Sequence, residues 1–302
     1  MIAVTERFRL TRPPEATPPH RETIVAGLRD ADALICTLAE QIDAPMLAEA
    51  SHLRVIANYA VGYNNIDLVA ARAHNIIVTN TPDILTDTTA DLTWALMLAT
   101  ARRVPEGHHF VQQGAWRGWD PRQLLGTDIF GHTLGIIGMG RIGQAVARRA
   151  AGFNMPVIYY NHTAKRFPDQ PSWRSVALYE VLAQADFLTL HVPLTPDTRH
   201  LIGRQTLQLM QPTAYLINVA RGPVVDEAAL AEALREGRVA GAGLDVYEHE
   251  PAVHSGLLGL RNVVTLPHLG SATEATRIRM GMVCLENVCA VMEGRPVPNR
   301  VT

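Results

Sequence analysis

The chain has 302 residues, of which 47% are hydrophobic and 19% are charged, and its net charge is −2 with histidine neutral. This length suits two ordinary domains, and the near-neutral charge excludes an extended nucleic-acid-binding surface. The opening "MIAVTERFRL" lacks the apolar stretch of a signal peptide, and no apolar run is long enough to cross a membrane. We therefore expect a cytoplasmic protein with neither a nucleic-acid nor a membrane partner.

Short apolar runs alternate along the chain with helical patterns, which indicates an α/β fold. The expected strands are 33–36, 54–60, 76–80, 134–140, 156–161, 186–193, 214–220, 241–247 and 262–268. The expected helices are 89–104, 142–153, 178–185, 226–237 and a long final helix, 272–294. Most of the strand segments are almost continuously apolar, as is typical of parallel strands buried on both faces.

The order of these elements predicts two doubly wound parallel-sheet domains of the Rossmann or flavodoxin type. The first comprises residues 1–81, on which the final segment 271–302 packs back, and the second comprises residues 82–270. We expect a cleft between the two domains. Cys36, Cys284 and Cys289 lack CxxC spacing, so we expect reduced, buried thiols and no metal site.

The segment "GMGRIG" (138–143) follows an apolar strand and opens a helix. In a GxGxxG motif, the first glycine (Gly138) allows a tight turn and the second (Gly140) lets the backbone approach a pyrophosphate. The third, Gly143, lets the helix pack closely on the strand, and the helix N-terminus offers N–H groups to the anion. The pattern predicts a dinucleotide site, although a glycine-rich turn that binds nothing has the same local signature.

Charged side chains follow three of the later strands. Arg221 follows 214–220, Glu248 and Glu250 follow 241–247, and His268 ends 262–268. Parallel strands bind ligands at their carboxyl ends, so these groups are expected to converge. Arginine can bind a carboxylate through two hydrogen bonds, and a glutamate beside a histidine stabilises the imidazolium. Taken singly, Arg221 could cap a helix and His268 could be a structural histidine.

The segment "VIYYNHTAKRF" (157–167) replaces the acidic residue that usually binds the adenosine ribose with Asn161. A carboxylate there would repel the 2′-phosphate of NADP, whereas Asn161 and Thr163 can share hydrogen bonds with it. Lys165 or Arg166 can pair with its charge. The segment favours NADP(H), with NAD(H) as the other possibility; a solvated basic loop without cofactor contact is the structural alternative.

Several motifs in order show a resemblance to a known family. These are "NYAVGYNNID" (58–67), "TNTPDILTDTTADL" (79–92), "GMGRIG", "HVPLTPDT" (191–198), "NVARGPVVDE" (218–227), "GLDVYEHEP" (243–251) and "PHLGSAT" (267–273). Together they resemble the D-isomer-specific 2-hydroxyacid dehydrogenases, and within them the glyoxylate/hydroxypyruvate reductases. The resemblance extends from about residue 29 to 301 and marks 1–81 plus 271–302 as the substrate-binding lid and 82–270 as the dinucleotide-binding domain.

The resemblance implies a role for each matched residue. His268 would protonate the keto oxygen of a small 2-oxoacid while hydride arrives from the nicotinamide, with Glu250 as its partner and Glu248 structural. Arg221 and the backbone N–H groups of Val61 and Gly62 would bind the substrate carboxylate. No metal is needed. The positions implied to contact the cofactor are Thr89, Gly138, Met139, Gly140, Arg141, Ile142, Gly143, Asn161, His162, Thr163, Lys165, Arg166, Pro193, Val219, Asp245 and Ser271. For Asp245, service to a turn is the structural alternative.

The segment "GAWRGWDP" (114–121) resembles the dimer region of the family, so a homodimer is expected. Trp119 is the candidate to reach the substrate of a partner subunit; the alternative is that both tryptophans pin a loop or a dimer core. Relatives that prefer NADPH commonly have Arg where this chain has His162, which weakens the positive charge at that point.

The chain departs from the family at its start, because it reaches "NYAVG" earlier than family members do. Either the first β–α unit is missing or "MIAVTERFRL" takes its place. Other functions also fit the resemblance: a D-lactate-like or phosphoglycerate-type specificity, or a non-catalytic, NAD-sensing corepressor. Retention of Arg221, Glu250 and His268 favours catalysis.

Overall fold

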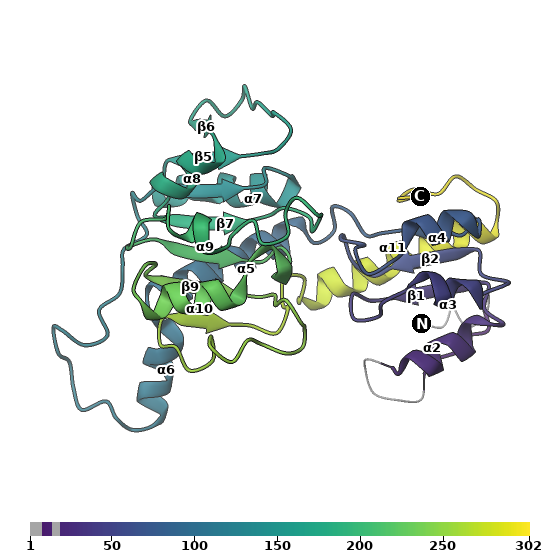
Figure 1. Cartoon of the computed structure of the whole chain (residues 1–302), viewed down its shortest axis with the longest axis horizontal. Helices are drawn as coiled ribbons and strands as arrows, with labels where there is room; N and C mark the ends of the chain where they lie inside the picture. Colours follow the sequence, from purple (N-terminus) through teal and green to yellow (C-terminus); the bar gives the residue numbers. More distant parts are fainter. Residues whose placement is uncertain (1–7, 14–18) are drawn as a thin grey trace. The chain divides into compact units, whose positions relative to one another are not determined.

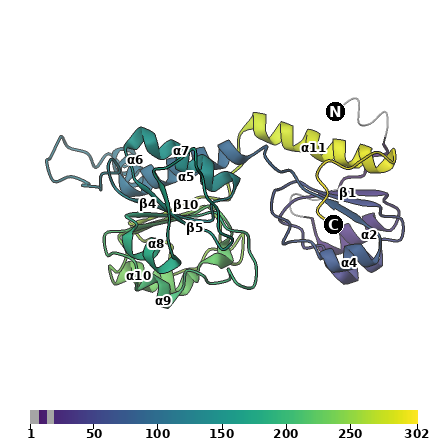
Figure 2. The ribbon, with the colours of Figure 1, turned by 90° about the horizontal axis from the view of Figure 1, so that it is seen from above.

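The computed structural model describes residues 8–13 and 19–302, which form two compact units. Unit 1 comprises Met1–Leu85 with Thr273–Thr302, and unit 2 comprises Thr86–Ala272. Each boundary lies a few residues beyond the one expected from the sequence. Both units contain a parallel sheet with helices on both faces (Figures 1 and 2), which confirms the predicted fold class.

Unit 1 has a three-stranded parallel sheet in the order β1-β2-β3. Its elements are α2 (Arg21–Leu28), β1 (Ala33–Cys36), α3 (Ala44–Ala48), β2 (Val55–Asn58), α4 (Leu68–Ala73), β3 (Ile77–Thr79) and α11 (Glu274–Met292). Figure 2 shows α11 on one face of this sheet and α2 and α4 on the other. The long final helix therefore packs on the first part of the chain, as the sequence predicted.

The N-terminal segment is only partly described. Residues 1–7 of "MIAVTERFRL", the segment expected to replace the first β–α unit if that unit is not missing, lie outside the described residues. Phe8 is described, and it packs with Val55 and Ala57 of β2 and with Val288 of α11. An apolar residue of this segment therefore contributes to the core of unit 1.

Unit 2 has a seven-stranded parallel sheet in the order β10-β9-β8-β7-β4-β5-β6. Its strands are β4 (Leu134–Ile137), β5 (Val157–Tyr160), β6 (Trp173–Ser175), β7 (Phe187–Leu190), β8 (Tyr215–Asn218), β9 (Gly241–Leu244) and β10 (Val263–Thr265). Its helices are α5 (Thr86–Ala101), α6 (Val104–Gln112), α7 (Arg141–Ala150), η1 (Ala151–Phe153), α8 (Leu178–Gln184), α9 (Arg204–Leu207), η2 (Gly222–Val224) and α10 (Glu227–Arg235). Strands β4, β7, β8 and β9 are buried along their whole length, as continuous apolar runs require.

The strand order of unit 2 reverses between β4 and β7. The chain proceeds from β4 to β5 and β6 on one side, and from β7 through β10 on the other. In doubly wound sheets such a switch point opens a crevice at the carboxyl ends of the strands, where ligands bind. The "GMGRIG" segment begins at the carboxyl end of β4, next to this point.

Several elements differ from the sequence prediction, and the helices α2, α3, α4, α6 and α9 were not among those expected. The helix expected at 89–104 ends at Ala101, because Arg103 adopts a left-handed conformation and separates α5 from α6. Strand β6 was not predicted, since its three residues, Trp-Arg-Ser, lack an apolar run. Cys36 and Cys284 are buried as expected, whereas Cys289 is only half-buried; all three are free thiols.

Candidate active site

The glycine turn of unit 2 is shaped to receive an anion. Gly138 has a φ of 99°, and a Cβ there would lie 2.7 Å from the carbonyl carbon and oxygen of His191. At Gly143, a Cβ would lie 2.2 Å from the carbonyl oxygen of Gly138. A Cβ at Gly140 would instead meet nothing within 4 Å, and α7 begins at the next residue. The open space at Gly140 and the N-terminus of α7 suit a pyrophosphate, so this turn fits a dinucleotide.

We expect an added methyl group to affect NADPH binding at Gly140 and folding stability at Gly143. Gly140→Ala should leave the thermal midpoint of the free protein unchanged, because its methyl meets open space. It should weaken NADPH binding on the order of tenfold to a hundredfold, since intrusion into a close contact costs about 1–3 kcal/mol. Gly143→Ala should lower the thermal midpoint, because its methyl meets backbone. Melting curves with and without NADPH measure both effects, and an unchanged NADPH shift in Gly140→Ala would contradict the assignment.

The segment after β5 contacts the glycine turn directly. Asn161 accepts a hydrogen bond from the Met139 N–H through Oδ1 at 3.0 Å, and Lys165 donates from Nζ to the Met139 carbonyl oxygen at 3.3 Å. The Asn161 side chain also donates to the Thr163 carbonyl oxygen at 2.6 Å. His162, Thr163, Lys165 and Arg166 are exposed. Thus Lys165 places a cation beside the turn, although Asn161 is already engaged by the backbone.

His191 was not predicted from the sequence as a site residue. It follows β7, and its backbone lies against Gly138 at the switch point. The buried Nε2 atom has no hydrogen-bond partner among the described residues, and burial lowers the pKa of His191 to about 3. His191 is therefore held neutral at the switch point, with its backbone rather than its ring against the glycine turn. The motif "HVPLTPDT" contained this signal, but only Pro193 was assigned from it.

The structure brings His268, Glu250 and Arg221 together at the carboxyl edge of the sheet. His268 Nδ1 lies 2.9 Å from Glu250 Oε2, and both side chains are about one-third exposed, at 32% and 36%. The charge of Glu250 also acts on the half-buried Arg221. His268 follows β10, Glu250 follows β9 and Arg221 follows β8. Three adjacent parallel strands therefore deliver a paired histidine and glutamate and an arginine to one edge.

Asp245 and Thr89 anchor the loop that carries His268. Asp245 is fully buried, and its two carboxylate oxygens accept from the backbone N–H groups of Leu269 at 2.6 Å and Gly270 at 2.8 Å. Thr89 donates to the Gly270 carbonyl oxygen at 3.0 Å. His268 itself has a φ of 54°, a conformation that such contacts must maintain. Asp245 and Thr89 thus hold the backbone of the His268 loop in place.

Backbone packing and Asn218 position Arg221. Asn218 accepts from the Ala220 N–H at 3.0 Å and donates to the Arg221 carbonyl oxygen at 3.1 Å, so its amide closes the turn after β8. A Cβ at Gly222 would lie 1.8 Å from the Tyr247 carbonyl carbon, so only glycine allows the backbone after Arg221 to meet the backbone after β9. This close approach sets the distance between Arg221 and the Glu250 loop.

Three pKa shifts describe the charges at this edge. Burial raises the pKa of Glu250, but the hydrogen bond and charge of His268 lower it by more, with help from the Tyr247 N–H and from Arg221. The net pKa of Glu250 is therefore below its ordinary value, and the carboxylate is ionised at neutral pH. Burial lowers the pKa of Arg221, opposed by Glu250, and burial raises that of Asp245, opposed by its two backbone hydrogen bonds and by His268.

Glu248 has structural partners, as the sequence predicted. Its Oε1 lies 2.6 Å from Nε2 of His200, and its Oε2 accepts from the Glu227 N–H at 3.1 Å. The buried Glu227 in turn accepts from the N–H groups of Glu248 and His254. These contacts connect the 248–254 loop to the start of α10.

The Val61–Gly62 segment lies in unit 1, just beyond the carboxyl end of β2. Its backbone carbonyls accept side-chain hydrogen bonds: Asn80 donates to Val61 at 2.8 Å and Asn58 donates to Gly62 at 2.7 Å. In the part of the chain that the structure describes, neither the Val61 nor the Gly62 N–H donates to a protein acceptor. Two N–H groups are therefore available for an anion.

The other predicted site residues lie at the same edge of unit 2 or far from it. Val219 is buried at the end of β8, Ser271 is half-buried after the His268 loop, Pro193 is exposed after β7, and Ile142 is half-buried in α7. Arg141 is exposed at the start of α7. Trp119 lies elsewhere: it is 84% exposed on the segment after α6, which projects from the body of unit 2 (Figure 1).

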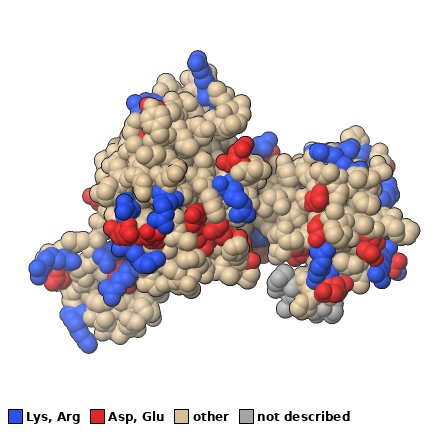
Figure 3. Space-filling model, viewed as in Figure 1, with Lys and Arg blue, Asp and Glu red and all other residues tan. Residues whose placement is uncertain are grey.

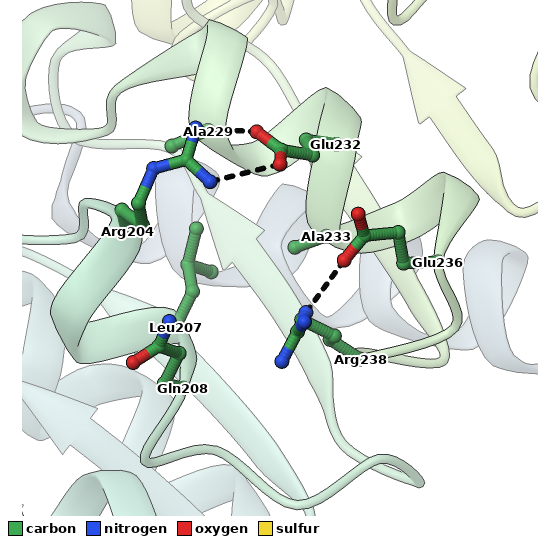
Figure 4. A pocket seen from close by; sticks show the side chains of 8 residues that line it. All are labelled: Arg204, Leu207, Gln208, Ala229, Glu232, Ala233, Glu236 and Arg238. Carbon is green, nitrogen blue, oxygen red and sulfur yellow. Dashed lines mark hydrogen bonds and ion pairs between the residues drawn. The ribbon is translucent and has the colours of Figure 1, made fainter.

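A shallow hollow between α9 and α10 contains charged side chains but no available cation (Figure 4). Arg204 donates to both carboxylate oxygens of Glu232, and Arg238 lies 2.7 Å from Glu236. Figure 3 shows basic and acidic side chains interspersed over this part of unit 2. We assign it no ligand. Within residues 8–13 and 19–302 there is no cluster of His, Cys, Asp or Glu suited to a metal, and no helix there could span a membrane.

Comparison with known proteins places the chain in a family. Residues 94–270 match the sequence model of the D-isomer specific 2-hydroxyacid dehydrogenase NAD binding domain. A glyoxylate reductase of Thermococcus kodakarensis is 48% identical over 303 residues, which cover 98% of this chain and 90% of the relative. 

Solved structures of relatives have the same fold. An NADPH-dependent glyoxylate/hydroxypyruvate reductase from Sinorhizobium meliloti, in complex with NADP and malonate, has a TM-score of 0.85 at 36% identity, covering 92% of this chain and 86% of its own. A D-lactate dehydrogenase from Aquifex aeolicus, complexed with NAD and lactic acid, has a TM-score of 0.81 at 29% identity, covering 89% and 85%. The chain belongs to the D-isomer specific 2-hydroxyacid dehydrogenase family, and within it is most similar in sequence to the glyoxylate reductases among these relatives.

Proposed function

We propose that the chain reduces glyoxylate to glycolate, or hydroxypyruvate to D-glycerate, with a nicotinamide dinucleotide. The observation that carries the proposal is the 2.9 Å contact between His268 and Glu250, with Arg221 beside them, at the edge that also holds the glycine turn. When bound, the reduced nicotinamide supplies the hydride that adds to the carbonyl carbon. High identity to glyoxylate reductases supports this substrate class.

His268 donates the proton of the reaction. Its Nδ1 faces Glu250, so Nε2 is the ring atom left to protonate the developing alkoxide oxygen. The ionised Glu250 carboxylate stabilises the imidazolium that holds this proton. The Asp245 and Thr89 contacts keep the loop in place, so that the ring does not have to reorganise at the moment of transfer.

Arg221 binds the substrate carboxylate and polarises the carbonyl. A guanidinium can form two parallel hydrogen bonds with a carboxylate, which fixes its orientation as well as its position. The N–H groups of Val61 and Gly62 are the second set of donors that we assign to this carboxylate. Both sets recognise a 2-oxoacid by the group that the reaction leaves unchanged.

We assign NADP(H) as the preferred cofactor, with NAD(H) as the alternative. The Lys165 Nζ lies 3.3 Å from the Met139 carbonyl oxygen, within reach of the ribose end of a dinucleotide on this turn. The residue directly after β5 is Asn161 and not a carboxylate that would repel a 2′-phosphate. His162 and Arg166 are exposed nearby and can add charge. A Sinorhizobium relative with the same fold is NADPH-dependent.

A homodimer is part of the proposal. Trp116, Trp119, Leu125 and Phe130 are each more than half exposed on or beside the projecting segment after α6. Exposed apolar clusters of this kind mark interaction surfaces, and a second copy of the chain is the partner that the family resemblance implies. Contact between Trp119 and a partner's substrate stays a prediction, as does the cytoplasmic location. Sedimentation of only a 33.1 kDa species would contradict the dimer.

Initial rates of glyoxylate and hydroxypyruvate reduction, with NADPH and with NADH at matched concentrations, test this function. We expect turnover with both cofactors and a preference for NADPH. Lys165→Ala should weaken NADPH binding about fivefold, the scale of one exposed charge pair, and leave NADH unaffected. Arg148→Ala, an exposed cation elsewhere on α7, is the matched control.

Each possible outcome has a distinct meaning. A preference for NADH would retain the reductase and remove the NADPH assignment. Turnover of D-lactate or phosphoglycerate-type substrates instead of glyoxylate would favour the alternative specificities. Of these, the D-lactate specificity is the weaker candidate beside glyoxylate, because the D-lactate dehydrogenase relative is only 29% identical. A folded protein that binds the cofactor but turns over no 2-oxoacid would point to a corepressor-like role.

A further inference from the structure

The loop Ala60–Tyr63 of unit 1 carries the N–H groups assigned to the substrate carboxylate. It lies where β2 ends, and every carbonyl in it accepts a hydrogen bond from within the unit. Ala60 accepts from the Thr81 N–H at 2.9 Å, and Tyr63 accepts from the Ile66 N–H at 3.1 Å. Side chains bind the two carbonyls between them: Asn80 binds Val61 and Asn58 binds Gly62.

Peptide geometry converts these contacts into an orientation. In a trans peptide the C=O of one residue and the N–H of the next point in opposite directions. A carbonyl of Val61 held by Asn80 therefore turns the N–H of Gly62 away from Asn80. In the same way, the contact from Asn58 to Gly62 turns the N–H of Tyr63 outward, and the contact from Thr81 to Ala60 turns that of Val61.

The N–H groups of Gly62 and Tyr63 thus point away from the two asparagine side chains, and that of Val61 points away from the backbone N–H of Thr81. In the described part of the chain, none of Val61, Gly62 and Tyr63 donates its N–H to a protein acceptor. Successive backbone N–H groups of this kind form a concave site for an anion. Without the two asparagine contacts, the peptide planes after Val61 and Gly62 could rotate. The N–H groups of Gly62 and Tyr63 would then lose their fixed directions.

The asparagines are themselves held rigidly. Asn58 is fully buried, and its amide faces that of Asn65 at 3.4 Å. Asn65, also buried, donates to the carbonyls of Thr37 at 2.9 Å and Glu40 at 3.1 Å. This network spans the carboxyl ends of β1 and β2, so the rigid sheet sets the position of the loop. Tyr59 adds a contact to α11, because its hydroxyl donates to the Arg277 carbonyl.

We propose that Asn80 and Asn58 are positioning residues, which hold the Val61 and Gly62 carbonyls inward and so direct the N–H groups of Gly62 and Tyr63 to the substrate carboxylate. Tyr63 thereby becomes a third backbone donor beside Val61 and Gly62. The inference rests on the proposed reduction of a 2-oxoacid. It assigns part of the substrate affinity to side chains that do not touch the substrate.

Asn80 is the residue to replace, since it is only half-buried and its loss leaves the core intact. Asn80→Ala and Asn80→Leu both remove the donor, but leucine keeps the bulk of the side chain. Both should raise the KM for glyoxylate and the inhibition constant of oxamate about fivefold to tenfold, the effect of one hydrogen bond. The kcat and the KM for NADPH should stay close to those of the wild type.

Arg54→Ala is the control. Arg54 precedes β2 at the end opposite the loop, and its side chain donates to the Val291 carbonyl oxygen of α11 at 3.2 Å rather than to the loop or to Asn80. We expect it to lower the thermal midpoint without changing the KM for glyoxylate. If it raises KM as much as Asn80→Ala does, general loosening of unit 1 explains the effect and the proposal is wrong. Recovery of the wild-type KM by leucine alone would show that Asn80 only fills space, with the same consequence.

Hydrogen exchange of the peptide 59–66 provides a readout that does not depend on turnover. Its Ala60 N–H donates to the Asn58 carbonyl and its Ile66 N–H to the Tyr63 carbonyl. Asn80→Ala should make both exchange faster, and Arg54→Ala should not. Unchanged exchange in Asn80→Ala would overturn the proposal even if the protein proved inactive. If the wild type reduces no 2-oxoacid, the proposed function is wrong. The rate measurements detect that outcome independently of the hydrogen exchange.

Discussion

Replacing His268 with asparagine should lower kcat for glyoxylate reduction by roughly a hundredfold to ten-thousandfold, the usual range for loss of a general acid. Asparagine is the informative substitution because His268 has a φ of 54°, and asparagine tolerates this left-handed conformation better than alanine. The loop should therefore keep its shape, and the KM for NADPH should change little. Steady-state kinetics near neutral pH, with melting curves to confirm folding, measure the effect.

Glu250→Gln is the companion variant for His268→Asn. Glutamine can keep a hydrogen bond to the ring, but it removes the charge that stabilises the imidazolium. The pH above which the reduction rate falls should therefore move to a lower value, while activity at acidic pH survives. A pH profile identical to that of the wild type would remove Glu250 from the proton-transfer step, and full activity of His268→Asn would remove His268.

Replacing Arg221 with alanine should raise the KM for glyoxylate about a hundredfold, because charge-assisted hydrogen bonds contribute about 1.5–3 kcal/mol. Part of any fall in kcat would report lost polarisation of the carbonyl. Arg221→Lys keeps the charge but loses the planar pair of donors, so it should lie between alanine and the wild type. The measurement is the dependence of the rate on glyoxylate concentration at saturating NADPH.

Arg204→Ala is the matched control for this prediction. Arg204 is an exposed arginine of α9 in unit 2, and its guanidinium pairs with Glu232 of α10 (Figure 4). Its loss should leave the KM for glyoxylate unchanged, since surface ion pairs contribute little. If Arg221→Ala has the same KM as Arg204→Ala, Arg221 does not bind the substrate carboxylate.

Local pattern was sufficient for most elements of the fold. The apolar run 33–36 predicted β1 with its observed ends, and the other predicted strands lie where expected but are shorter. The break between α5 and α6 was missed, although Pro105 in the first turn of α6 was a signal for it; the left-handed conformation of Arg103 that makes the break has no signal of its own in the sequence. Strand β6 was missed because pairing with β5, rather than apolar periodicity, defines it.

Some residues of the candidate site could likewise be found from the sequence, and others could not. Arg221, Glu250 and His268 could be singled out because parallel strands deliver their carboxyl ends to one edge, but the Nδ1–Oε2 contact depends on two loops that the sequence does not shape. His191 and the asparagines Asn58 and Asn80 were missed. Their significance comes from partners: a buried atom without a hydrogen bond in one case, and two carbonyls of a distant loop in the other.

The sequence by itself determined the α/β class, the glycine turn, the family and the residue types available for chemistry. These four properties follow from short-range hydrophobic periodicity and from motifs that are contained within a few consecutive residues. Only the tertiary structure decided that Asp245 holds the His268 loop, that Asn161 already binds the Met139 N–H, and that Asn80 binds the Val61 carbonyl. Hydrogen bonds are directional and short, so which polar groups meet is settled only when packing has set the positions of the strands that carry them.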